Sequence, residues 1–328
     1  MKIVSTCYYP DFDVWTWPEW AADELQRNFP AFEIVRLTSK ERLLTEIQNA
    51  DIFFAWTVSE EAFRAARKLK WIHTGMAGVN WILIPPVVES DVLVSNSKGV
   101  HAVPVAEHTM ALILAFSRRL HDCLEYQRKG LWGRTPIHAA SPSFEEVLGK
   151  TIGILGLGAI GQEIAKRARA FGMRVIGIKK NPAVGHEFAD KVVGADKLND
   201  VLPEIDYLVI ATPSTPGTRN LIGREQMDRL KPTCFIINIA RGEIIDQDAL
   251  IDNLNSGRIA GAGLDVFTPD PLPDNHPLYF AKNVILTPHA SGVSPRLWRR
   301  VTDLFVENIR RFLAGRELIN QVDKRRGY

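Results

Sequence analysis

The sequence predicts an α/β protein made of doubly wound parallel sheets, in which helices cover both faces of each sheet. Short apolar runs of strand length alternate with amphipathic helical patterns along almost the whole chain. Runs without polar alternation are typical of strands buried on both faces, as parallel strands are. The chain has 328 residues, 46% hydrophobic and 24% charged, which is enough for two domains of ordinary size.

Strands are expected wherever such a run is bounded by turn residues. These runs cover residues 2–6, 33–37, 51–56, 71–75, 92–97, 151–158, 174–178, 207–212, 234–240, 262–267 and 284–289. The first five precede residue 100 and contain no glycine-rich turn, whereas the run from Thr151 opens a second α/β unit. We therefore expect two doubly wound parallel-sheet domains.

Two helical segments indicate how the domains are connected. Residues 103–120 are apolar on most faces, which is typical of a helix buried between domains or between subunits. The last helix carries one apolar stripe, formed by Leu297, Val301, Leu304, Phe305 and Phe312, and Gly315 is its expected C-terminal cap. If that helix packs on the first unit, one domain is discontinuous. We expect it to comprise residues 1–99 and 290–328, with a second domain, 100–289, inserted.

Composition excludes several classes of partner. A net charge of +2 indicates neither a nucleic-acid partner nor a membrane surface. The longest strongly apolar helical segment, residues 110–116, is far below the roughly 20 residues that span a bilayer. Three scattered cysteines fit a reducing compartment better than a disulfide framework, and the N-terminus reads as a strand rather than a signal peptide. We expect a cytoplasmic protein.

The segment GLGAIG predicts a dinucleotide-binding turn. It follows a strand-like run and opens a helix, the context that gives a GxGxxG pattern its meaning. Gly156 permits the tight turn, Gly158 lets the backbone approach a pyrophosphate, and Gly161 lets the helix lie close to the sheet. The amides of Ala159 and Ile160 would hold the phosphates. The inserted domain is therefore expected to be a Rossmann domain; a glycine-rich turn without ligand is the alternative.

Lys179 and Lys180 end the second strand of that domain, where NAD-binding versions place an acidic residue about 20 residues after the glycines. Two ammonium groups attract a 2′-phosphate and give a plain 2′-hydroxyl no acceptor. The sequence therefore predicts a preference for NADP over NAD. The alternative is a solvated strand end in an enzyme that uses either cofactor.

Further polar residues follow the later strands of the same unit. Arg241 follows the run 234–240, Asp265 is expected within a strand, Asp270 lies in the proline-rich loop beyond it, and His289 follows the last strand. Ligands of open parallel sheets bind at the carboxyl ends of the strands. These side chains are candidates for the chemistry.

The segments GLGAIG, ARGEIIDQDAL, GLDVFTPDPLP and LTPHASG occur in the order and spacing of the D-2-hydroxyacid dehydrogenase family. That family includes glyoxylate/hydroxypyruvate reductases, D-lactate dehydrogenases and phosphoglycerate dehydrogenases. The segment NSKGVHAVPVAEHTMALIL also resembles the helix that forms the family's dimer. The resemblance is best over residues 70–292. It implies a flavodoxin-like substrate domain, a homodimer and an NAD(P)-dependent enzyme acting on the CH–OH group.

The resemblance assigns roles that the chemistry of the residues supports. Arg241 matches the arginine that clamps the carboxylate and ketone oxygens of a 2-keto acid, for which a planar guanidinium is suited. His289 matches the acid that protonates the carbonyl oxygen, since imidazole titrates near neutral pH. Asp270 stands where the family usually has the glutamate that favours the imidazolium form. It is one methylene shorter than the family residue, and a turn aspartate before Pro271 is the alternative.

Cofactor contacts follow from the same resemblance. Asp265 resembles the aspartate near the nicotinamide carboxamide, and Ile239 the residue whose carbonyl lies there. Thr212 and Pro213 resemble the loop that lines the adenine side.

On the substrate side, the segment HTGMAGVN resembles the family's carboxylate-binding loop. The backbone amides of Met76, Ala77 and Gly78 are the candidates, because successive small residues let amides converge on one anion. An ordinary turn is the alternative. His73 beside it is expected to be structural rather than catalytic. The histidines form no metal-ligand set, so no metal is expected.

The expected function is reduction of a small 2-keto acid by NADPH, with glyoxylate or hydroxypyruvate as the best single expectation. A dinucleotide-sensing corepressor of the same fold is the alternative from another class, and the complete arginine, histidine and acid set argues against it. A formate dehydrogenase of this family would carry glutamine at the Asp270 position. A phosphite dehydrogenase is a further alternative.

Overall fold

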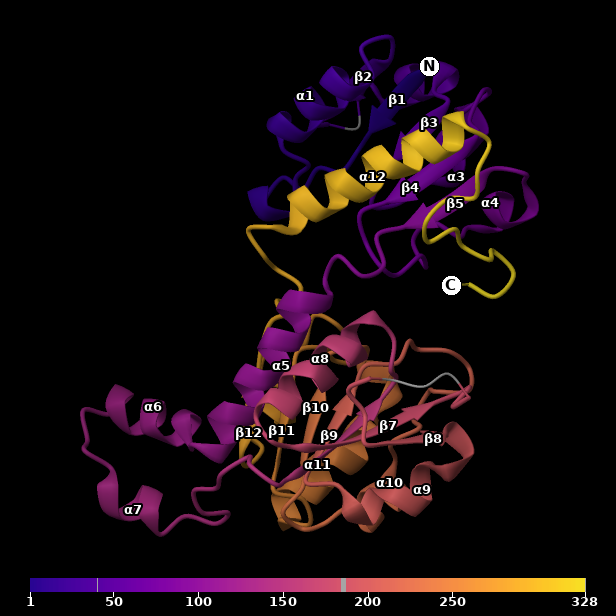
Figure 1. The fold of residues 1–328 in the computed structure, drawn as a ribbon. Helices are drawn as coiled ribbons and strands as arrows, with labels where there is room; N and C mark the ends of the chain where they lie inside the picture. The colour runs from indigo at the N-terminus through magenta and orange to yellow at the C-terminus, as the bar shows by residue number, and fades with distance from the viewer. Residues whose placement is uncertain (40, 184–186, 328) are drawn as a thin grey trace. The chain divides into compact units, whose positions relative to one another are not determined.

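The structure is a computed structural model that describes residues 1–39, 41–183 and 187–327. It divides into two compact units (Figure 1). Unit 1 comprises Met1–His101 and the chain from Val293 onward, and unit 2 comprises Ala102–Gly292. The borders expected from the sequence, 99/100 and 289/290, lie close to these. Which unit binds substrate and which binds cofactor stays a prediction.

Unit 1 contains a five-stranded parallel sheet in the order β2-β1-β3-β4-β5. Its strands are β1 (Lys2–Ser5), β2 (Glu33–Arg36), β3 (Ile52–Phe54), β4 (Trp71–Thr74) and β5 (Leu93–Asn96). Its helices are α1 (Glu19–Asn28), α2 (Leu43–Glu46), α3 (Glu60–Ala65), α4 (Pro85–Glu89) and α12 (Leu297–Leu313). This order starts in the middle of the sheet and winds outward in both directions.

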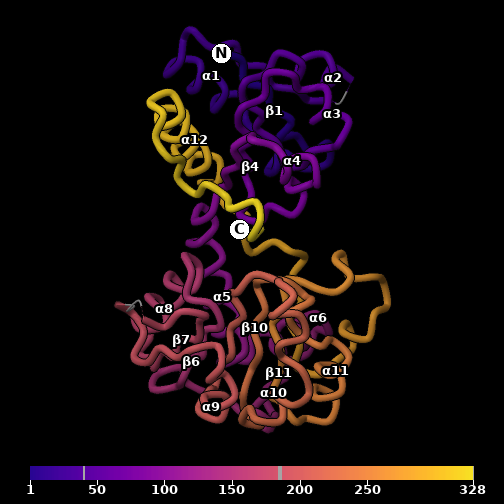
Figure 2. Tube along the Cα trace, turned by 90° about the vertical axis from the view of Figure 1, so that its right-hand side faces the viewer, coloured from indigo at the N-terminus to yellow at the C-terminus, as the bar shows by residue number. Residues whose placement is uncertain are grey.

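Successive residues of these strands pack on opposite faces of the sheet. Phe54 and Trp71 lie in the core shared with α1 and α12, whereas Phe53 and Ile72 lie in the core shared with α3 and α4. The apolar runs therefore reflect burial on both faces. Helix α12 carries the expected apolar stripe and lies beside the strands of unit 1, at the other end of the chain (yellow in Figures 1 and 2).

Unit 2 contains a seven-stranded parallel sheet in the order β12-β11-β10-β9-β6-β7-β8. Its strands are β6 (Thr151–Leu155), β7 (Arg174–Lys179), β8 (Lys191–Gly194), β9 (Tyr207–Ile210), β10 (Phe235–Asn238), β11 (Gly261–Leu264) and β12 (Val284–Leu286). Its helices are α5 (Ala102–Ser117), α6 (Leu120–Arg128), α7 (Arg134–His138), α8 (Ala159–Ala170), α9 (Leu198–Val201), α10 (Arg224–Arg229) and α11 (Gln247–Ser256).

The strand order of unit 2 reverses between β6 and β9. From β6 the chain proceeds to β7 and β8 on one side, and then returns to build β9 through β12 on the other. One face packs on α5 and α8, and the other on α9, α10 and α11. Such a reversal leaves a crevice at the carboxyl ends of the two central strands, where open parallel sheets bind their ligands. The expected doubly wound fold with a Rossmann unit is confirmed.

One helix and one strand of unit 2 differ most from the sequence-based expectation. The helix expected over 103–120 ends at Ser117, because Arg119 adopts a positive φ of 51° before α6 begins. Helices α6 and α7 form an arm that extends away from the sheet (Figure 1). Strand β8 was not expected, because it is a short edge strand whose four residues are only half-buried. Within the described ranges, no helix is long and apolar enough to cross a membrane.

Candidate active site

The predicted cofactor and catalytic residues of unit 2 lie where its strands end. Gly156 follows β6 with a φ of +105°, a conformation that favours glycine. A Cβ there would lie 2.7 Å from the carbonyl oxygen of Ala211, in the loop after β9. A Cβ at Gly161 would lie 2.1 Å from the carbonyl oxygen of Gly156. Both glycines are therefore required by close backbone approach, as the motif predicts.

Gly158 is different, because a Cβ there would meet no heavy atom within 4 Å. Gly158 directly precedes α8, which begins at Ala159 without any side-chain cap. The first turn of an α-helix leaves its N–H groups without intrahelical acceptors and carries the positive end of the helix dipole. The amides of Ala159 and Ile160 thus fit a pyrophosphate, and Thr212 and Pro213 follow directly in the loop beside Gly156.

Lys179 and Lys180 stand at the carboxyl end of β7, next to the glycine loop in the sheet. Lys179 is half-buried and pairs in register with Gly194 of β8, and Lys180 is exposed just beyond the strand. Because β7 is on the far side of β6 from β9, these cations lie on the opposite side of the reversal from Arg241 and His289. A dinucleotide that crosses the reversal would have its adenosine end here.

Arg241 stands three residues beyond β10 and is exposed. Its backbone is extended and precedes a short 3₁₀ turn that begins at Gly242, a residue with no room for a side chain because a Cβ would lie 2.1 Å from the backbone of Phe267. Its Nη1 atom donates to its neighbour Ala240 at 2.7 Å. Ile239 is buried between β10 and this turn. Among the residues that the structure describes, no acidic side chain pairs with this guanidinium, so the rest of its fork can bind an anion.

His289 and Asp270 form a pair at the same edge of the sheet. The Nδ1 atom of His289 lies 2.8 Å from Oδ2 of Asp270. The side chain of His289 is 51% exposed and that of Asp270 33%. The shorter aspartate therefore reaches the ring, and because Nδ1 is engaged, Nε2 is the nitrogen left to face a substrate. The positive φ of His289, 51°, is a strained conformation of the kind that clusters at functional sites.

The carboxylate of Asp265 holds the loop that carries His289. It is fully buried and accepts hydrogen bonds from the hydroxyl of Thr287 at 2.6 Å and from the amides of Ala290 at 2.9 Å and Ser291 at 3.0 Å. The strand was expected to extend to residue 267 and to contain Asp265, but it ends at Leu264, so Asp265 directly follows it. With its oxygens engaged in this way, its predicted contact with nicotinamide stays a prediction.

His108 of α5 completes that network, which the sequence did not indicate. Its Nε2 atom lies 3.1 Å from the hydroxyl of Thr287, whose only hydrogen is donated to Asp265, so Nε2 must donate. Burial lowers the pKa of His108, which keeps its ring neutral. One sequence feature could have indicated this network: Thr287 and Ser291, two residues that form hydrogen bonds readily, flank His289 within a single short segment.

In unit 1, the predicted carboxylate loop follows β4. Gly75 lies against the ring of Trp56, where a Cβ would be 2.7 Å from the ring. The amide of Met76 makes one long hydrogen bond, 3.4 Å, to the hydroxyl of Thr74. In the part of the chain that the structure describes, the amides of Ala77 and Gly78 have no hydrogen-bond acceptor. Two free neighbouring amides form the kind of concavity that binds an anion.

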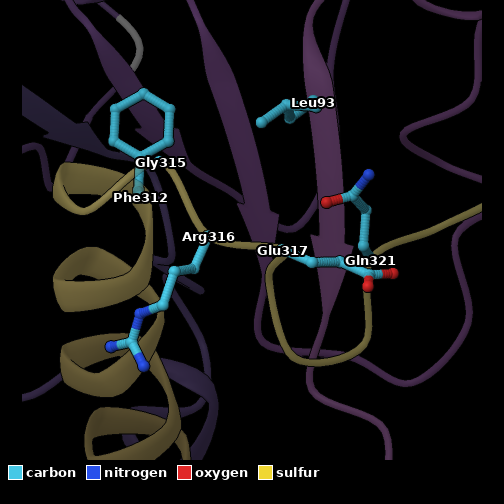
Figure 3. Close-up of a pocket in the computed structure, with 6 residues that line it drawn as sticks. All are labelled: Leu93, Phe312, Gly315, Arg316, Glu317 and Gln321. Carbon is cyan, nitrogen blue, oxygen red and sulfur yellow. The ribbon is translucent and has the colours of Figure 1, made fainter.

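A hollow of about 310 Å³ lies elsewhere in unit 1 (Figure 3). It is lined by Leu93, Phe312, Gly315, Arg316, Glu317 and Gln321. Leu93 is the first residue of β5, so the hollow is at the amino ends of the parallel strands, opposite the carboxylate loop. None of the predicted site residues lines it. Among the described residues there is also no cluster of three or more potential metal ligands.

The family model for the D-isomer specific 2-hydroxyacid dehydrogenase NAD-binding domain matches residues 110–291, more than half of the chain. The chain belongs to this dehydrogenase family. A glyoxylate reductase from Korarchaeum cryptofilum is 33% identical over 291 residues, which are 86% of each protein. A D-3-phosphoglycerate dehydrogenase from Methanocaldococcus jannaschii is 35% identical over 89% of this chain, and the chain spans only 55% of that longer protein.

Solved structures of 2-hydroxyacid dehydrogenases resemble this one over its whole length. An NADPH-dependent glyoxylate/hydroxypyruvate reductase from Sinorhizobium meliloti, in complex with NADP and sulfate, has a TM-score of 0.83 and 26% identity, and the match covers 100% of this chain and 99% of that one. The resemblance inferred from the sequence motifs is thus confirmed. As a member of this family, the protein is an NAD(P)-dependent oxidoreductase acting on the CH–OH group of 2-hydroxy acids.

Proposed function

We propose that the protein is an NADPH-preferring reductase of small 2-keto acids such as glyoxylate or hydroxypyruvate. The observation that carries the proposal is the pair of His289 and Asp270 at the sheet edge that also bears Arg241, with a glycine loop fit for a pyrophosphate on the same sheet. A proton donor, a carboxylate clamp and a dinucleotide site are the three things that reduction of a 2-keto acid needs. Relatives of this chain that reduce glyoxylate support the choice of substrate.

The proposed chemistry assigns one task to each residue. A bound reduced nicotinamide supplies the hydride that converts the ketone carbon to an alcohol. Arg241 binds the carboxylate and polarises the ketone oxygen, and Met76, Ala77 and Gly78 supply amides to the carboxylate. His289 delivers a proton from Nε2 to the ketone oxygen while Asp270 holds Nδ1. Asp265 and Ile239 are the proposed nicotinamide-side contacts, and Thr212 and Pro213 the adenine-side contacts.

The decisive experiment follows NADPH oxidation with a panel of 2-keto acids, including glyoxylate, hydroxypyruvate, pyruvate and phenylpyruvate. The smallest acids should give the highest kcat/KM. Oxidation of NADPH with none of them would contradict the proposed function. Formate and phosphite with NADP, run in the opposite direction, should give no reduction of the cofactor.

Cofactor preference has a test of its own. Changing both Lys179 and Lys180 to alanine should weaken NADPH binding about 10- to 100-fold, because the pair together supplies charge-assisted hydrogen bonding to the 2′-phosphate worth about 1.5–3 kcal/mol. NADH binding should change little. Titration of cofactor fluorescence measures both dissociation constants.

Lys197→Ala is the matched control for that pair, because Lys197 is an exposed lysine of the same unit whose ammonium faces Asp200 rather than the glycine loop. It should leave both cofactors unaffected. Equal losses of NADPH and NADH in the double variant would refute the phosphate assignment.

A homodimer located in the cytoplasm completes the proposal. The arm of α6 and α7 exposes apolar side chains, including Leu124, Leu131 and Trp132, which is 88% exposed. Apolar side chains gathered on one projecting segment favour a protein partner, and a second copy is the partner that the family resemblance implies. All three cysteines are free thiols, which is compatible with the proposed reducing compartment. Sedimentation at micromolar concentration distinguishes dimer from monomer.

A further inference from the structure

His73 lies beneath the carboxylate loop and has no role in the mechanism above. It belongs to β4, is fully buried, and its ring stacks on that of Phe305 with the centroids 4.9 Å apart. Both ring nitrogens have hydroxyl partners. Nδ1 lies 2.8 Å from Oγ of Ser95, and Nε2 lies 3.2 Å from Oγ of Ser97. Both serines belong to or follow β5 and are themselves fully buried.

Counting hydrogens fixes the direction of these bonds. The hydroxyl of Ser97 donates its only hydrogen to the carbonyl oxygen of Thr74 at 2.8 Å, so it must accept from Nε2 of His73. In a neutral ring with its hydrogen on Nε2, Nδ1 accepts, and Ser95 must be its donor. The oxygen of Ser95 in turn accepts from Nε1 of Trp71 at 2.9 Å. These hydrogen bonds therefore form a series in which every donor points the same way, from the indole of Trp71 to the carbonyl of Thr74.

The neutral state of the ring agrees with its surroundings. Burial lowers the pKa of His73 to about 3, so the ring carries no charge near neutral pH. A protonated ring would carry an N–H on Nδ1 as well, so the hydroxyl hydrogen of Ser95 would lose its acceptor. Every polar atom in this series of hydrogen bonds therefore has a partner only when the ring is neutral and carries its hydrogen on Nε2.

The last hydrogen bond of this series is made to the backbone of the carboxylate loop. Ser97 holds two points of it, since its hydroxyl donates to the carbonyl of Thr74 and its amide donates to the carbonyl of Met76 at 2.9 Å. The side-chain amide of Asn96 donates to the carbonyl of Ala77 at 2.7 Å. In a planar trans peptide, the carbonyl of one residue and the N–H of the next point in opposite directions. Anchoring the carbonyls of Met76 and Ala77 therefore turns the N–H groups of Ala77 and Gly78 away from β5.

We propose that His73 is a positioning residue for the substrate carboxylate. By holding the hydroxyl of Ser97 on the carbonyl of Thr74, the ring fixes the peptide units that present the amides of Ala77 and Gly78. His73 itself does not touch the substrate. The inference rests on the proposed function, because it takes the loop to bind the carboxylate of a 2-keto acid.

The test compares three replacements of His73. Glutamine places an amide nitrogen near the position of Nε2 and keeps a donor for Ser97, asparagine reaches only toward Ser95, and leucine keeps bulk without any donor. His73→Leu and His73→Asn should raise KM for the 2-keto acid about tenfold or more, because the hydroxyl of Ser97 loses its donor and the loop then holds its two amides in the binding arrangement for less of the time. The kcat at saturation and the NADPH dissociation constant should stay within about twofold. His73→Gln should restore most of the wild-type KM.

Two further variants separate positioning from general stability. Ser97→Ala removes the link between ring and loop and should reproduce the KM effect of His73→Leu even if the latter folds poorly. Thr302→Val is the matched control, because this fully buried hydroxyl of α12 in the same unit has no hydrogen-bond partner among the described residues. It should leave KM unchanged. A glutamine variant with a KM as high as that of the leucine variant would overturn the proposal, as would equal effects on KM and kcat.

Hydrogen–deuterium exchange of the cofactor-free protein gives a measurement that needs no activity. Segments that contain residues 75–79 should exchange faster in His73→Leu than in the wild type or His73→Gln, whereas exchange in unit 2 should not change. Unchanged exchange of the loop in His73→Leu would overturn the positioning role. A wild-type protein that reduces no 2-keto acid would refute the proposed function instead, and the exchange comparison would still decide whether His73 orders the loop.

Discussion

Replacing His289 by alanine should lower kcat for 2-keto acid reduction about 10²- to 10⁴-fold at neutral pH, the usual contribution of a general acid. The reason is geometric, because Nδ1 is held by Asp270 at 2.8 Å and only Nε2 is left to protonate the ketone oxygen. Binding of NADPH should be unchanged, since the glycine loop and the lysines of β7 lie on the other side of the strand reversal. Single-turnover kinetics and a fluorescence titration of NADPH measure the two effects separately.

His138→Ala is the control for this substitution, because His138 is an exposed histidine of α7 outside the proposed site. It should reduce acids at the wild-type rate. Turnover of the His289→Ala variant within tenfold of the wild type would remove His289 from the role of acid.

Replacing Arg241 by alanine should lower kcat/KM for 2-keto acids by about 10²- to 10⁴-fold, because a bidentate pair of charge-assisted hydrogen bonds is lost at about 1.5–3 kcal/mol each. Arg241→Lys should recover only part of this loss, since an ammonium keeps the charge but not the planar fork. Steady-state kinetics at saturating NADPH measure both variants. The loss should appear in KM as well as kcat, because the guanidinium binds the carboxylate before the reaction and polarises the ketone during it.

Arg229→Ala serves as the matched control for Arg241. Arg229 is exposed in α10, where it pairs with Glu225, and it belongs to a helix that covers one face of the sheet. Its loss should not alter kcat/KM. If Arg241→Ala and Arg229→Ala had the same small effect, Arg241 would be a structural ion-pairing residue rather than a substrate clamp.

The features predicted best are those in which the local backbone allows only one residue type, or in which a residue directly follows a buried strand. Gly156 and Gly161 are required by contacts of about 2–3 Å that any side chain would violate, so a short motif was enough to locate the turn. Arg241 and His289 follow apolar runs, and the carboxyl ends of parallel strands meet at one edge of a sheet. The doubly wound fold followed from burial on both faces.

Other features depend on distances that no local pattern encodes. Asp270 and His289 are separated by a proline-rich loop and strand β12, and nothing in this spacing shows that the shorter acid still reaches the ring at 2.8 Å. The networks around Asp265 and His73 use serine, threonine and histidine, which fit many environments, so their pairing appears only when the strands are placed side by side. Arg119 with its positive φ interrupts an otherwise continuous helical pattern without glycine or proline to mark the break.

The strand order of unit 2 has a consequence for redesign. Strand β7, with Lys179, and strand β10, which precedes Arg241, are separated by β6 and β9, and neighbouring strands lie about 4.8 Å apart. Sites more than about 7–10 Å apart that share no partner usually contribute additively to free energies. The preference for a coenzyme and the preference for a 2-keto acid should thus be adjustable independently of each other. The fold-losses in kcat/KM caused by Lys179→Ala and by Arg241→Lys should multiply when both changes are made in one protein.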